Sequence, residues 1–404
     1  MVGSLDLVTA PPYDVIDDAE RTALAAKSPF NVVEIDLPHA DGGDPYLHAQ
    51  TTLEAWRQQG VLVREREPAI WALTQDYTGP DAGQRIRHGF LCRVRVEDYG
   101  PGRIRPHERT HPGPKEDRLR LTRATRANLS PIFSLFPDPD QEAWRALEPH
   151  TAGEPFGSVR DADGTLHRVW RVADEQTIAA VQDALRGREL LIADGHHRYE
   201  TACVYAREIG GEGEHSYVLM FLCSLSDPGL TIFPTHRLLT GLDSPRRKSL
   251  SETLERDFQS SEIGSDELEP GSDERGIAFG YLDREAGAPR RLRLRDQSIA
   301  DAALPDKPEP YRRLDTAVLE AIVLKGALGM SDDDISHLNG LSYSKDAGDA
   351  RAAVEGGRAN AAFFMRATPV EQVREVAEAG EVMPPKSTFF FPKVPTGLVF
   401  NPLE

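Results

Sequence analysis

The stretch of sequence that decides the fold lies at residues 190–202 and reads LLIADGHHRYETA. Its first part, LLIA, is an apolar run of the kind that forms a buried strand. Gly195 predicts a tight turn, because a residue without a Cβ atom tolerates a left-handed backbone. From His197 to Gly210 apolar residues recur at helical spacing. The stretch therefore predicts a strand, a glycine turn and a helix.

This turn carries residue types that suit phosphate. The start of a helix leaves backbone N–H groups without helical partners and adds roughly half a positive charge, so an anion is stabilised there. Arg198 can donate two parallel hydrogen bonds to one phosphate, while His196 and His197 add donors whose charge depends on pH. We predict that residues 195–198 bind phosphate. The alternative is a plain strand-to-helix turn with internally satisfied histidines.

Several further blocks of sequence belong with this turn. Neither the Walker pattern G-x-x-x-x-G-K-[ST] nor the dinucleotide pattern G-x-G-x-x-G is present. The blocks are PPYDVI at 11–16, NVVEIDLP at 31–38, KEDRLRLTRATRANLSPIFSLF at 115–136, FPTHRLL at 233–239 and MPPKSTFFFPKVPTGLVFNPL at 383–403. With ADGHHRYETA at 193–202, they resemble, from end to end, the bacterial family called domain of unknown function 1015. That family is regarded as a relative of the ParB/sulfiredoxin superfamily and of the archaeal ADP-dependent free-serine kinase.

The resemblance implies a mixed α/β fold with a ParB/sulfiredoxin-like nucleotide-binding core and additional N- and C-terminal α/β elements. In those relatives a Gly-x-x-Arg turn at a helix start grips nucleotide phosphates, and residues 195–198 fit that pattern. The resemblance further implies ADP or ATP with Mg²⁺, and a phosphotransferase acting on a small metabolite such as serine or phosphoserine. The free-serine kinase is shorter, so residues beyond about 245 depart from it. The substrate and the direction of transfer stay open.

Composition indicates a globular protein, for which we expect the cytoplasm. The 404 residues are 39% hydrophobic and 7% aromatic, which is enough for ordinary cores in two or three domains. No apolar stretch approaches the roughly 20 residues of a membrane span, and the N-terminus lacks an export signal. Cys92, Cys203 and Cys223 lie in apolar segments without C-x-x-C spacing, so we expect core thiols.

The formal net charge of −18 argues against nucleic acid as a partner, because affinity for a polyanion comes mainly from Lys and Arg. Basic residues nevertheless gather between 103 and 126. We predict that they attract a small anionic or amino-acid substrate, and a solvated helix face is the alternative. The residues of this predicted anion cleft are Arg109, Lys115, Arg118 and Arg123, with His236 and Arg237 added from the end of a later strand.

The chain divides into three predicted segments. Residues 1–150 form an N-terminal α/β part with the arginine-rich segment, residues 151–245 form the core with the turn, and residues 246–404 form a C-terminal α/β part. Expected helices cover 46–59, 115–129, 177–185, 197–210, 314–330, 349–354 and 369–378. Expected strands cover 32–37, 70–73, 89–96, 166–172, 190–193, 217–224, 230–233 and 361–365, and a solvated insertion is expected at 260–276.

Phosphoryl transfer needs a phosphate clamp, usually a divalent metal, and a carboxylate that accepts a proton. Glu108 is the first candidate for this carboxylate, because His107 and Arg109 flank it. Asp194 is the second, since it directly precedes the turn and could hold Mg²⁺. The further alternatives are Asp14, Glu116 and Asp117.

Two other classes of function stay open. A nucleotide-dependent switch without a chemical product, as in ParB relatives, needs a dimer surface and a partner. A metal-assisted phosphate hydrolase needs a bound metal with an open position, but adjacent histidines such as His196 and His197 rarely point at one ion. We therefore assign no metal ligands, and a homo-oligomer is left open. The tail residues Lys386, Ser387 and Thr388 either anchor the chain end in the core or close the active site.

Overall fold

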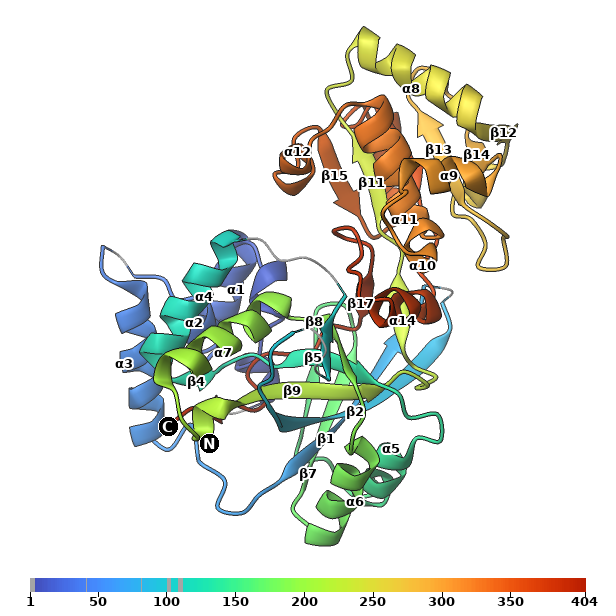
Figure 1. Ribbon diagram of the computed structural model, residues 1–404. Helices are drawn as coiled ribbons and strands as arrows, with labels where there is room; N and C mark the ends of the chain where they lie inside the picture. The colour runs from blue at the N-terminus through green and yellow to red at the C-terminus, as the bar shows by residue number, and fades with distance from the viewer. Residues whose placement is uncertain (1–3, 41, 81, 100–102, 108–111) are drawn as a thin grey trace. The chain divides into compact units, whose positions relative to one another are not determined.

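The structure is a computed structural model that describes residues 4–40, 42–80, 82–99, 103–107 and 112–404 (Figure 1). Contacts within the chain define two compact units, each of which is described by itself. The first comprises Met1–Pro106, Thr110–Thr231 and Pro392–Glu404, and the second comprises His107–Arg109 and Ile232–Phe391. The three predicted segments are a different division of the chain and stay a prediction.

The first unit is built on an eight-stranded sheet in the order β3-β8-β5-β9-β2-β1-β7-β6. Its strands are β1 (Ile70–Thr78), β2 (Gln84–Arg95), β3 (Ile104–Pro106), β5 (Ile132–Phe136), β6 (Gly157–Arg160), β7 (Leu166–Val172), β8 (Leu190–Asp194) and β9 (Tyr217–Ser224). Strands β3 and β8 pair in parallel, as do β5 and β9, whereas the other neighbouring pairs of this sheet are antiparallel. The sheet is therefore mixed, and the predicted mixed α/β class is confirmed.

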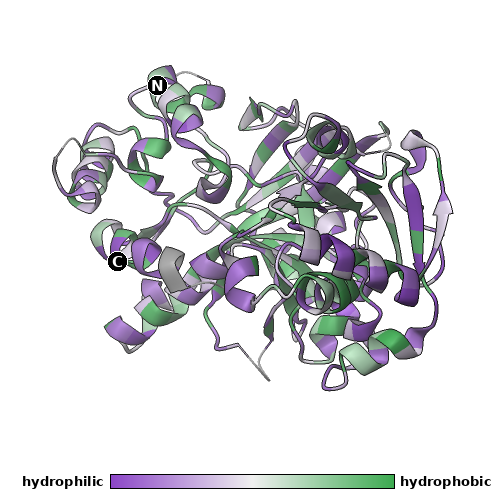
Figure 2. Ribbon diagram, turned by 90° about the horizontal axis from the view of Figure 1, so that it is seen from above, coloured by the Kyte–Doolittle hydropathy of each residue, from purple (hydrophilic) through white to green (hydrophobic). Residues whose placement is uncertain are grey.

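The first unit also contains helices. They are α1 (Asp18–Lys27), α2 (Val33–Asp36), α3 (Pro45–Gln58), α4 (Pro112–Thr125), α5 (Glu142–Leu147), α6 (Glu175–Leu185) and α7 (His196–Ile209). Of these, α1, α2 and α3 pack on one another and on α4. Helix α4 packs along α7 (Figure 1). In Figure 2 hydrophobic residues gather in the strands, as burial of a central sheet requires. The main core joins strand residues such as Met220 and Ile192 to Val181 of α6 and Tyr199 of α7.

The strand predicted at 32–37 is wrong, because this segment is the single helical turn α2. Asn31 explains the difference. Its Oδ1 accepts a hydrogen bond from the N–H of Val33, and its Nδ2 donates to the carbonyl oxygens of Leu7 and Thr9. A side chain that bonds the backbone two residues ahead favours a turn over a strand. Local packing therefore overrides the strand preference of the β-branched residues.

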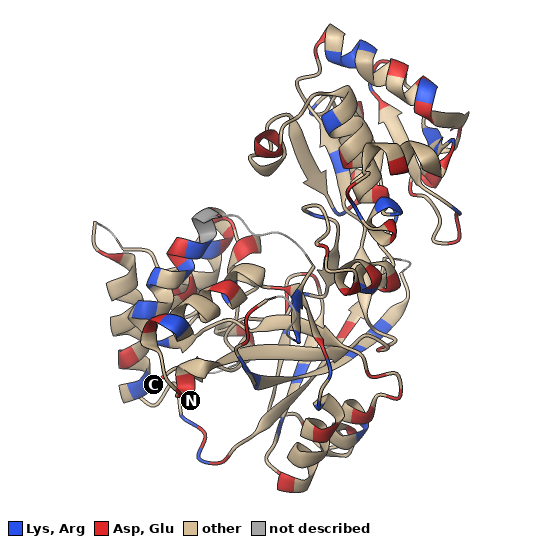
Figure 3. Cartoon of the chain, in the orientation of Figure 1, with Lys and Arg blue, Asp and Glu red and all other residues tan. Residues whose placement is uncertain are grey.

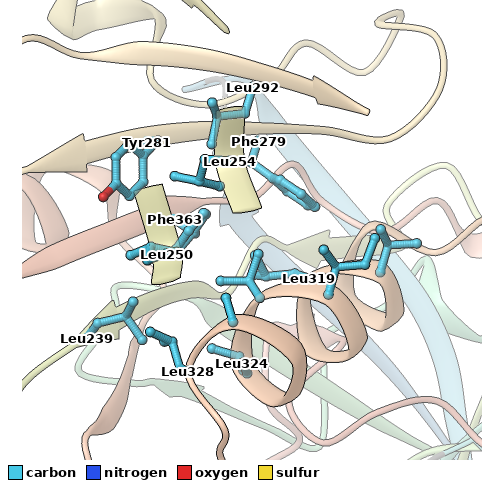
Figure 4. Close-up of a cluster of buried hydrophobic side chains, with 14 of the residues drawn as sticks. Leu239, Leu250, Leu254, Phe279, Tyr281, Leu292, Leu319, Leu324, Leu328 and Phe363 are labelled. Atoms are coloured by element: carbon cyan, nitrogen blue, oxygen red, sulfur yellow. The ribbon is translucent and has the colours of Figure 1, made fainter. Parts of the chain in front are cut away.

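The second unit contains a six-stranded sheet in the order β12-β14-β13-β16-β11-β15, and its neighbouring strands pair antiparallel. The strands are β11 (His236–Leu239), β12 (Phe258–Glu262), β13 (Ala278–Asp283), β14 (Arg290–Leu294), β15 (Leu341–Ser344) and β16 (Ala361–Phe364). The helices are α8 (Ser244–Asp257), α9 (Gln297–Ala303), α10 (Glu309–Arg312), α11 (Asp315–Val318), α12 (Asp332–Ser336), α13 (Ala347–Glu355) and α14 (Val370–Glu378). Figure 4 shows the core between sheet and helices, with Phe279, Leu319 and Phe363 at its centre.

Two expectations for the second unit need correction. The segment predicted as one α-helix at 314–330 is the short α11 followed by a π-helix over Leu319–Ala327. In a π-helix each backbone hydrogen bond spans five residues, one more than in an α-helix. The solvated insertion predicted at 260–276 begins inside strand β12, which pairs with β14 at the sheet edge. The side chains of residues 259–262 are exposed, which explains why the strand looks like a loop in sequence.

Three other predicted elements have different bounds. Strands β1 and β2 extend beyond the predicted 70–73 and 89–96, and the helix predicted at 115–129 ends at Thr125, before strand β4 (Ala127–Asn128). The remaining predicted elements are confirmed within a few residues, and those at 166–172 and 217–224 agree with β7 and β9 at both ends. Shorter elements are η1 (Leu5–Leu7), η2 (Tyr13–Val15), η3 (Glu148–Thr151), η4 (Glu214–Ser216), η5 (Ser265–Glu267), β4 (Ala127–Asn128), β10 (Thr231–Phe233), β17 (Phe389–Phe391) and β18 (Asn401–Pro402). None of the described helices combines the length and apolar composition needed to cross a membrane.

The last residues of the chain return to the first unit. Thr396 forms a two-way backbone bridge with Ala10, with N···O distances of 3.1 and 2.9 Å, and β18 pairs with β4. The segment 392–404, which we call the C-terminal segment, is therefore part of the first unit rather than a free tail.

Candidate functional site

The strand–turn–helix prediction at 190–210 is confirmed. Strand β8 ends at Asp194, Gly195 has φ of 93° and ψ of 29°, and α7 begins at His196. A Cβ atom at position 195 would lie only 3.0 Å from the guanidinium group of Arg198. Glycine is required here both by the left-handed backbone and by this close approach.

The start of α7 differs from the starts of other long helices in the chain. Helices α1, α6 and α8 begin after Asp17, Asp174 and Asp243, whose carboxylates accept a hydrogen bond from the helix backbone. Gly195 stands at this position in α7 and supplies no side-chain acceptor. The positive end of the α7 dipole is thus not neutralised by its own cap residue, which favours an external anion.

The carboxylate of Asp194 lies between two cations at the turn. Its Oδ2 accepts a hydrogen bond from Nη2 of Arg198 at 2.6 Å, and its Oδ1 forms an ion pair with Nζ of Lys393. Burial by itself raises the pKa of this carboxyl, but Lys393 and Arg198 outweigh burial and hold the pKa well below its usual range. Asp194 is therefore a fixed anion and a weak proton acceptor.

Arg198 ties the turn to the segment before β5. Its Nη1 donates to the Oγ of Ser130 at 2.8 Å and to the carbonyl oxygen of Pro131, while Nη2 contacts Asp194. The side chain is only 10% exposed. Ser130 Oγ in turn lies 2.8 Å from Oγ1 of Thr396 in the C-terminal segment. In this arrangement both terminal nitrogens of Arg198 bind protein oxygens, and its direct contact with phosphate stays a prediction.

Residues of the N-terminal blocks lie within electrostatic reach of the turn. Arg118 stacks on the ring of Tyr13 at 4.2 Å, and its Nη1 donates to the carbonyl oxygen of Asp36 at 2.7 Å. Burial raises the pKa of Tyr13 to about 12, and the charge of Arg198 opposes this rise. Burial also raises the pKa of Asp36, against Arg118 and Arg198. Asp14 adds a negative charge that acts on both Tyr13 and Arg198.

Residues from the quoted blocks 11–16, 31–38, 115–136 and 383–403 therefore lie around the turn in the first unit. We call Asp194, Gly195, Arg198, Ser130 and Lys393 the turn site. Tyr13, Asp36 and Arg118 border it. Sequence reasoning identified the turn, but it missed Lys393, Ser130, Tyr13 and Asp36. The signal that could have found them was their presence inside the quoted blocks 11–16, 31–38, 115–136 and 383–403.

A family model described as "Protein of unknown function (DUF1015)" matches residues 2–317. The chain belongs to this family. No curated protein matches this DUF1015 chain in sequence. This description names no activity for the family.

Solved structures that resemble this DUF1015 chain share little sequence with it. A conserved hypothetical protein from Pyrococcus furiosus is 16% identical, covers 76% of this chain and 93% of its own, and has a TM-score of 0.38. A free serine kinase in complex with AMP is 14% identical, with coverages of 74% and 86% and a TM-score of 0.40. SbnI with a C-terminal truncation, from Staphylococcus aureus, is 11% identical, with coverages of 75% and 84% and a TM-score of 0.38. At these scores the likeness carries no functional assignment.

Two residues of the predicted anion cleft face α7. Lys115 forms an ion pair with Glu200, and Arg123 donates to Glu208 at 3.0 and 2.6 Å. Figure 3 shows basic and acidic residues interleaved on α4 and α7. These contacts hold the two helices together and neutralise part of the local positive charge. Arg118 is buried against Asp36 and Asp117. An attraction of substrate by these cations stays a prediction.

The predicted catalytic pair is described only in part, because Glu108 and Arg109 lie outside the described residues. His107 is 1% exposed and belongs to the second unit. Its Nε2 lies 2.7 Å from Oγ1 of Thr388, and its carbonyl oxygen accepts a hydrogen bond from the N–H of Met383 at 2.7 Å. His107 is thus anchored to the block at 383–388, and the role of Glu108 as proton acceptor stays a prediction.

His236 and Arg237 begin β11 in the second unit, whereas the sequence predicts them at the end of a strand, and both are buried. Nδ1 of His236 accepts a hydrogen bond from the N–H of Met365 at 3.1 Å, and its Nε2 lies 3.0 Å from a carboxylate oxygen of Glu269. Arg237 donates to the carbonyl oxygens of Thr235 and Lys386. These contacts hold both side chains inside the second unit. Their binding of a substrate anion stays a prediction.

A Mg²⁺ ion does not fit the turn site as it is arranged. Both carboxylate oxygens of Asp194 face cations. Among the residues that the structure describes, no group of three or more His, Cys, Asp or Glu residues is placed to hold a metal ion.

The three cysteines are core thiols. Cys203 and Cys223 are buried and Cys92 is half-buried. Burial raises the pKa of all three thiols, so they are weak ligands and nucleophiles.

A cavity of about 1780 Å³ also lies in the first unit, away from the turn. Trp56, Phe90, Ile178 and Val399 are among its lining residues, and the lining includes none of residues 194–198. The lining also includes charged residues such as Glu97 and Arg188, but the turn site places its charged groups at a helix start.

Proposed function

We propose that this protein is a nucleotide-dependent phosphotransferase that holds ADP or ATP phosphates at the turn site. The acceptor or donor is a small metabolite such as serine or phosphoserine. The observation that carries the proposal is the start of α7 at left-handed Gly195, which lacks a side-chain cap and stands beside Lys393 and Arg198. A site of this kind stabilises the negative charge of phosphate.

The residues of the turn have separate roles in this proposal. The backbone N–H groups at the start of α7 contact phosphate oxygens, and His196 and His197 add side-chain donors. Arg198 keeps the turn in shape through Ser130 and Asp194, and its charge adds to the positive potential. During phosphoryl transfer, negative charge spreads over the oxygens of the transferred group. A positive potential that is already in place before the substrate binds stabilises this charge.

From the sequence, Glu108 stays our first candidate for the proton acceptor, with His107 next to it in the chain. The lowered pKa of Asp194 supports this order of candidates, because a carboxyl that resists protonation accepts a proton poorly in catalysis. Asp14, whose charge acts on Arg198, is the next candidate.

Mass spectrometry of products tests the proposal directly. The full chain is incubated with ADP, ATP or CTP and Mg²⁺, together with a set of amino acids that includes serine and phosphoserine. Transfer of phosphate between one nucleotide and one amino acid is the expected result. Release of inorganic phosphate in every mixture, without acceptor, would indicate a hydrolase. Nucleotide binding without any product would indicate a switch protein, and either result overturns the transferase proposal.

A further inference from the structure

A fully buried arginine stands in the middle of the sheet of the first unit. Arg87 of β2 has no exposed surface, and its guanidinium lies 4.5 Å from the ring centre of Phe133 and 5.4 Å from that of Phe221. Burial disfavours the charged form and lowers the pKa of Arg87. Burial of a cation opposes folding, because the charge loses its contact with water. An apolar residue at this position would avoid that cost, so the polar contacts of Arg87 indicate a role other than packing.

Arg87 and Gln75 hold two successive carbonyl groups of the C-terminal segment. Arg87 Nη2 donates to the carbonyl oxygen of Pro392, and its Nε donates to Oε1 of Gln75 at 2.8 Å. Gln75 Nε2 donates to the carbonyl oxygen of Lys393 at 3.0 Å. The backbone at 392–393 is therefore fixed from two neighbouring strands, β1 and β2.

A second layer of contacts orients Gln75 itself. Its Nε2 lies 3.0 Å from Nδ1 of His167 on β7, and Nε2 of His167 lies 2.8 Å from a carboxylate oxygen of Asp161. An amide that bonds Arg87 through its oxygen and His167 through its nitrogen has only one orientation. Its N–H group is consequently directed at the carbonyl of Lys393.

This fixed backbone places the side chain of Lys393 at the turn. Its Nζ forms an ion pair with Asp194, which directly precedes Gly195, and the Lys393 side chain is 19% exposed. A lysine ammonium is a compact point charge that phosphate sites commonly use. Asp194 keeps this charge beside the helix start, where the α7 dipole attracts the same anion.

We propose that Lys393 is a phosphate-binding residue of the turn site. Arg87 and Gln75 are positioning residues that hold the backbone of Lys393 so that its side chain lies at the turn. The proposal rests on the proposed nucleotide site and extends it to a residue from the other end of the chain. Arg87 and Gln75 act through the backbone of residues 392–393 and touch no ligand.

Calorimetric titration of ADP into the full chain tests the role of Lys393. Lys393→Met keeps the length of the side chain and removes its charge, so ADP affinity is expected to fall about tenfold or more. Lys393→Arg should recover part of the affinity, because it restores the charge with a different shape. Lys248→Met is the matched control. Lys248 is 78% exposed on α8 of the second unit, and its variant should bind ADP like the wild type.

The outcomes separate this proposal from the proposed function. A wild-type chain that binds ADP, with unchanged affinity in Lys393→Met, overturns the role of Lys393 and leaves the nucleotide site standing. A wild-type chain that binds none of ADP, ATP and CTP overturns the proposed function itself.

A double-mutant cycle tests the positioning role. Arg87→Gln removes a buried charge and risks misfolding, so Gln75→Glu is the main variant. It keeps a partner for Arg87 but replaces the N–H donor to Lys393 with a carboxylate oxygen. We expect Gln75→Glu to weaken ADP binding about fivefold in the wild-type background and to have little effect in Lys393→Met. Hydrogen exchange at residues 393–396 should also become faster. Equal losses in both backgrounds would show that Gln75 acts independently of Lys393 and would overturn this part.

Discussion

Asp194 and Lys393 lie 199 positions apart in the sequence and form an ion pair inside the first unit. The same carboxylate accepts a hydrogen bond from Arg198 at 2.6 Å. One acidic side chain thus joins the end of β8, the first turn of α7 and the C-terminal segment. The stability of the turn and its ability to bind an anion should therefore depend on residues from both ends of the chain.

The ion pairs of Asp194 predict a specific pH dependence of stability. Its pKa is lowered in the folded state, so its contribution is present above the unfolded pKa near 3.9 and is lost as pH falls below it. Asp194→Asn should lower the free energy of unfolding by about 2 kcal/mol at pH 7. Urea unfolding at several pH values should show this difference shrinking below pH about 4. A difference that is constant from pH 7 to pH 3 would contradict the account.

Arg198→Ala should destabilise the protein as well as alter binding. The substitution removes the hydrogen bonds of the guanidinium to Asp194, Ser130 and Pro131 and leaves Lys393 as the remaining cation beside Asp194, which costs about 3 kcal/mol in the free energy of unfolding. Arg198→Lys should recover only part of this loss, because an ammonium cannot reach Ser130, Pro131 and Asp194 with one planar group. Urea unfolding measures both variants. An unchanged midpoint in Arg198→Ala would mean that these contacts contribute nothing to the fold.

A substitution of Lys115 tests whether this residue only packs α4 against α7 or also attracts the substrate. If its charge attracts nucleotide, Lys115→Ala should slow ADP association about threefold at low salt, and the effect should disappear above about 0.5 M salt. Stopped-flow binding measures the association rate. If the rate is unchanged at low salt, the ion pair with Glu200 serves only to join α4 and α7.

Local structure was predictable from the sequence where one segment carries its own signal. The turn at Gly195 follows from an apolar run, a glycine and a helical repeat within twenty-one residues, 190–210. The turn at 31–36 was not predicted, because Asn31 bonds the distant carbonyls of Leu7 and Thr9, and periodicity carries no such information.

The composition of the turn site was only partly predictable for the same reason. Residue type indicates what Arg198 can donate to, but not that Ser130 and Pro131 occupy its Nη1. Lys393 reaches the site through a backbone fixed by Arg87 and Gln75, residues more than three hundred positions away in sequence. Long-range contacts of this kind leave no local pattern.

The measurement that tests the central claim most directly compares two glycine variants by titration with ADP. Gly195 and Gly187 both have a left-handed backbone, with φ of 93° and 72°. A Cβ atom at 187 would meet open space among the described residues, whereas one at 195 would meet the guanidinium of Arg198. Both alanine variants therefore carry similar backbone strain, of about 1 kcal/mol, but only one alters the turn. We predict that Gly195→Ala lowers ADP affinity about tenfold or more and that Gly187→Ala binds like the wild type. Equal affinity in the two folded variants would contradict a phosphate site at the start of α7.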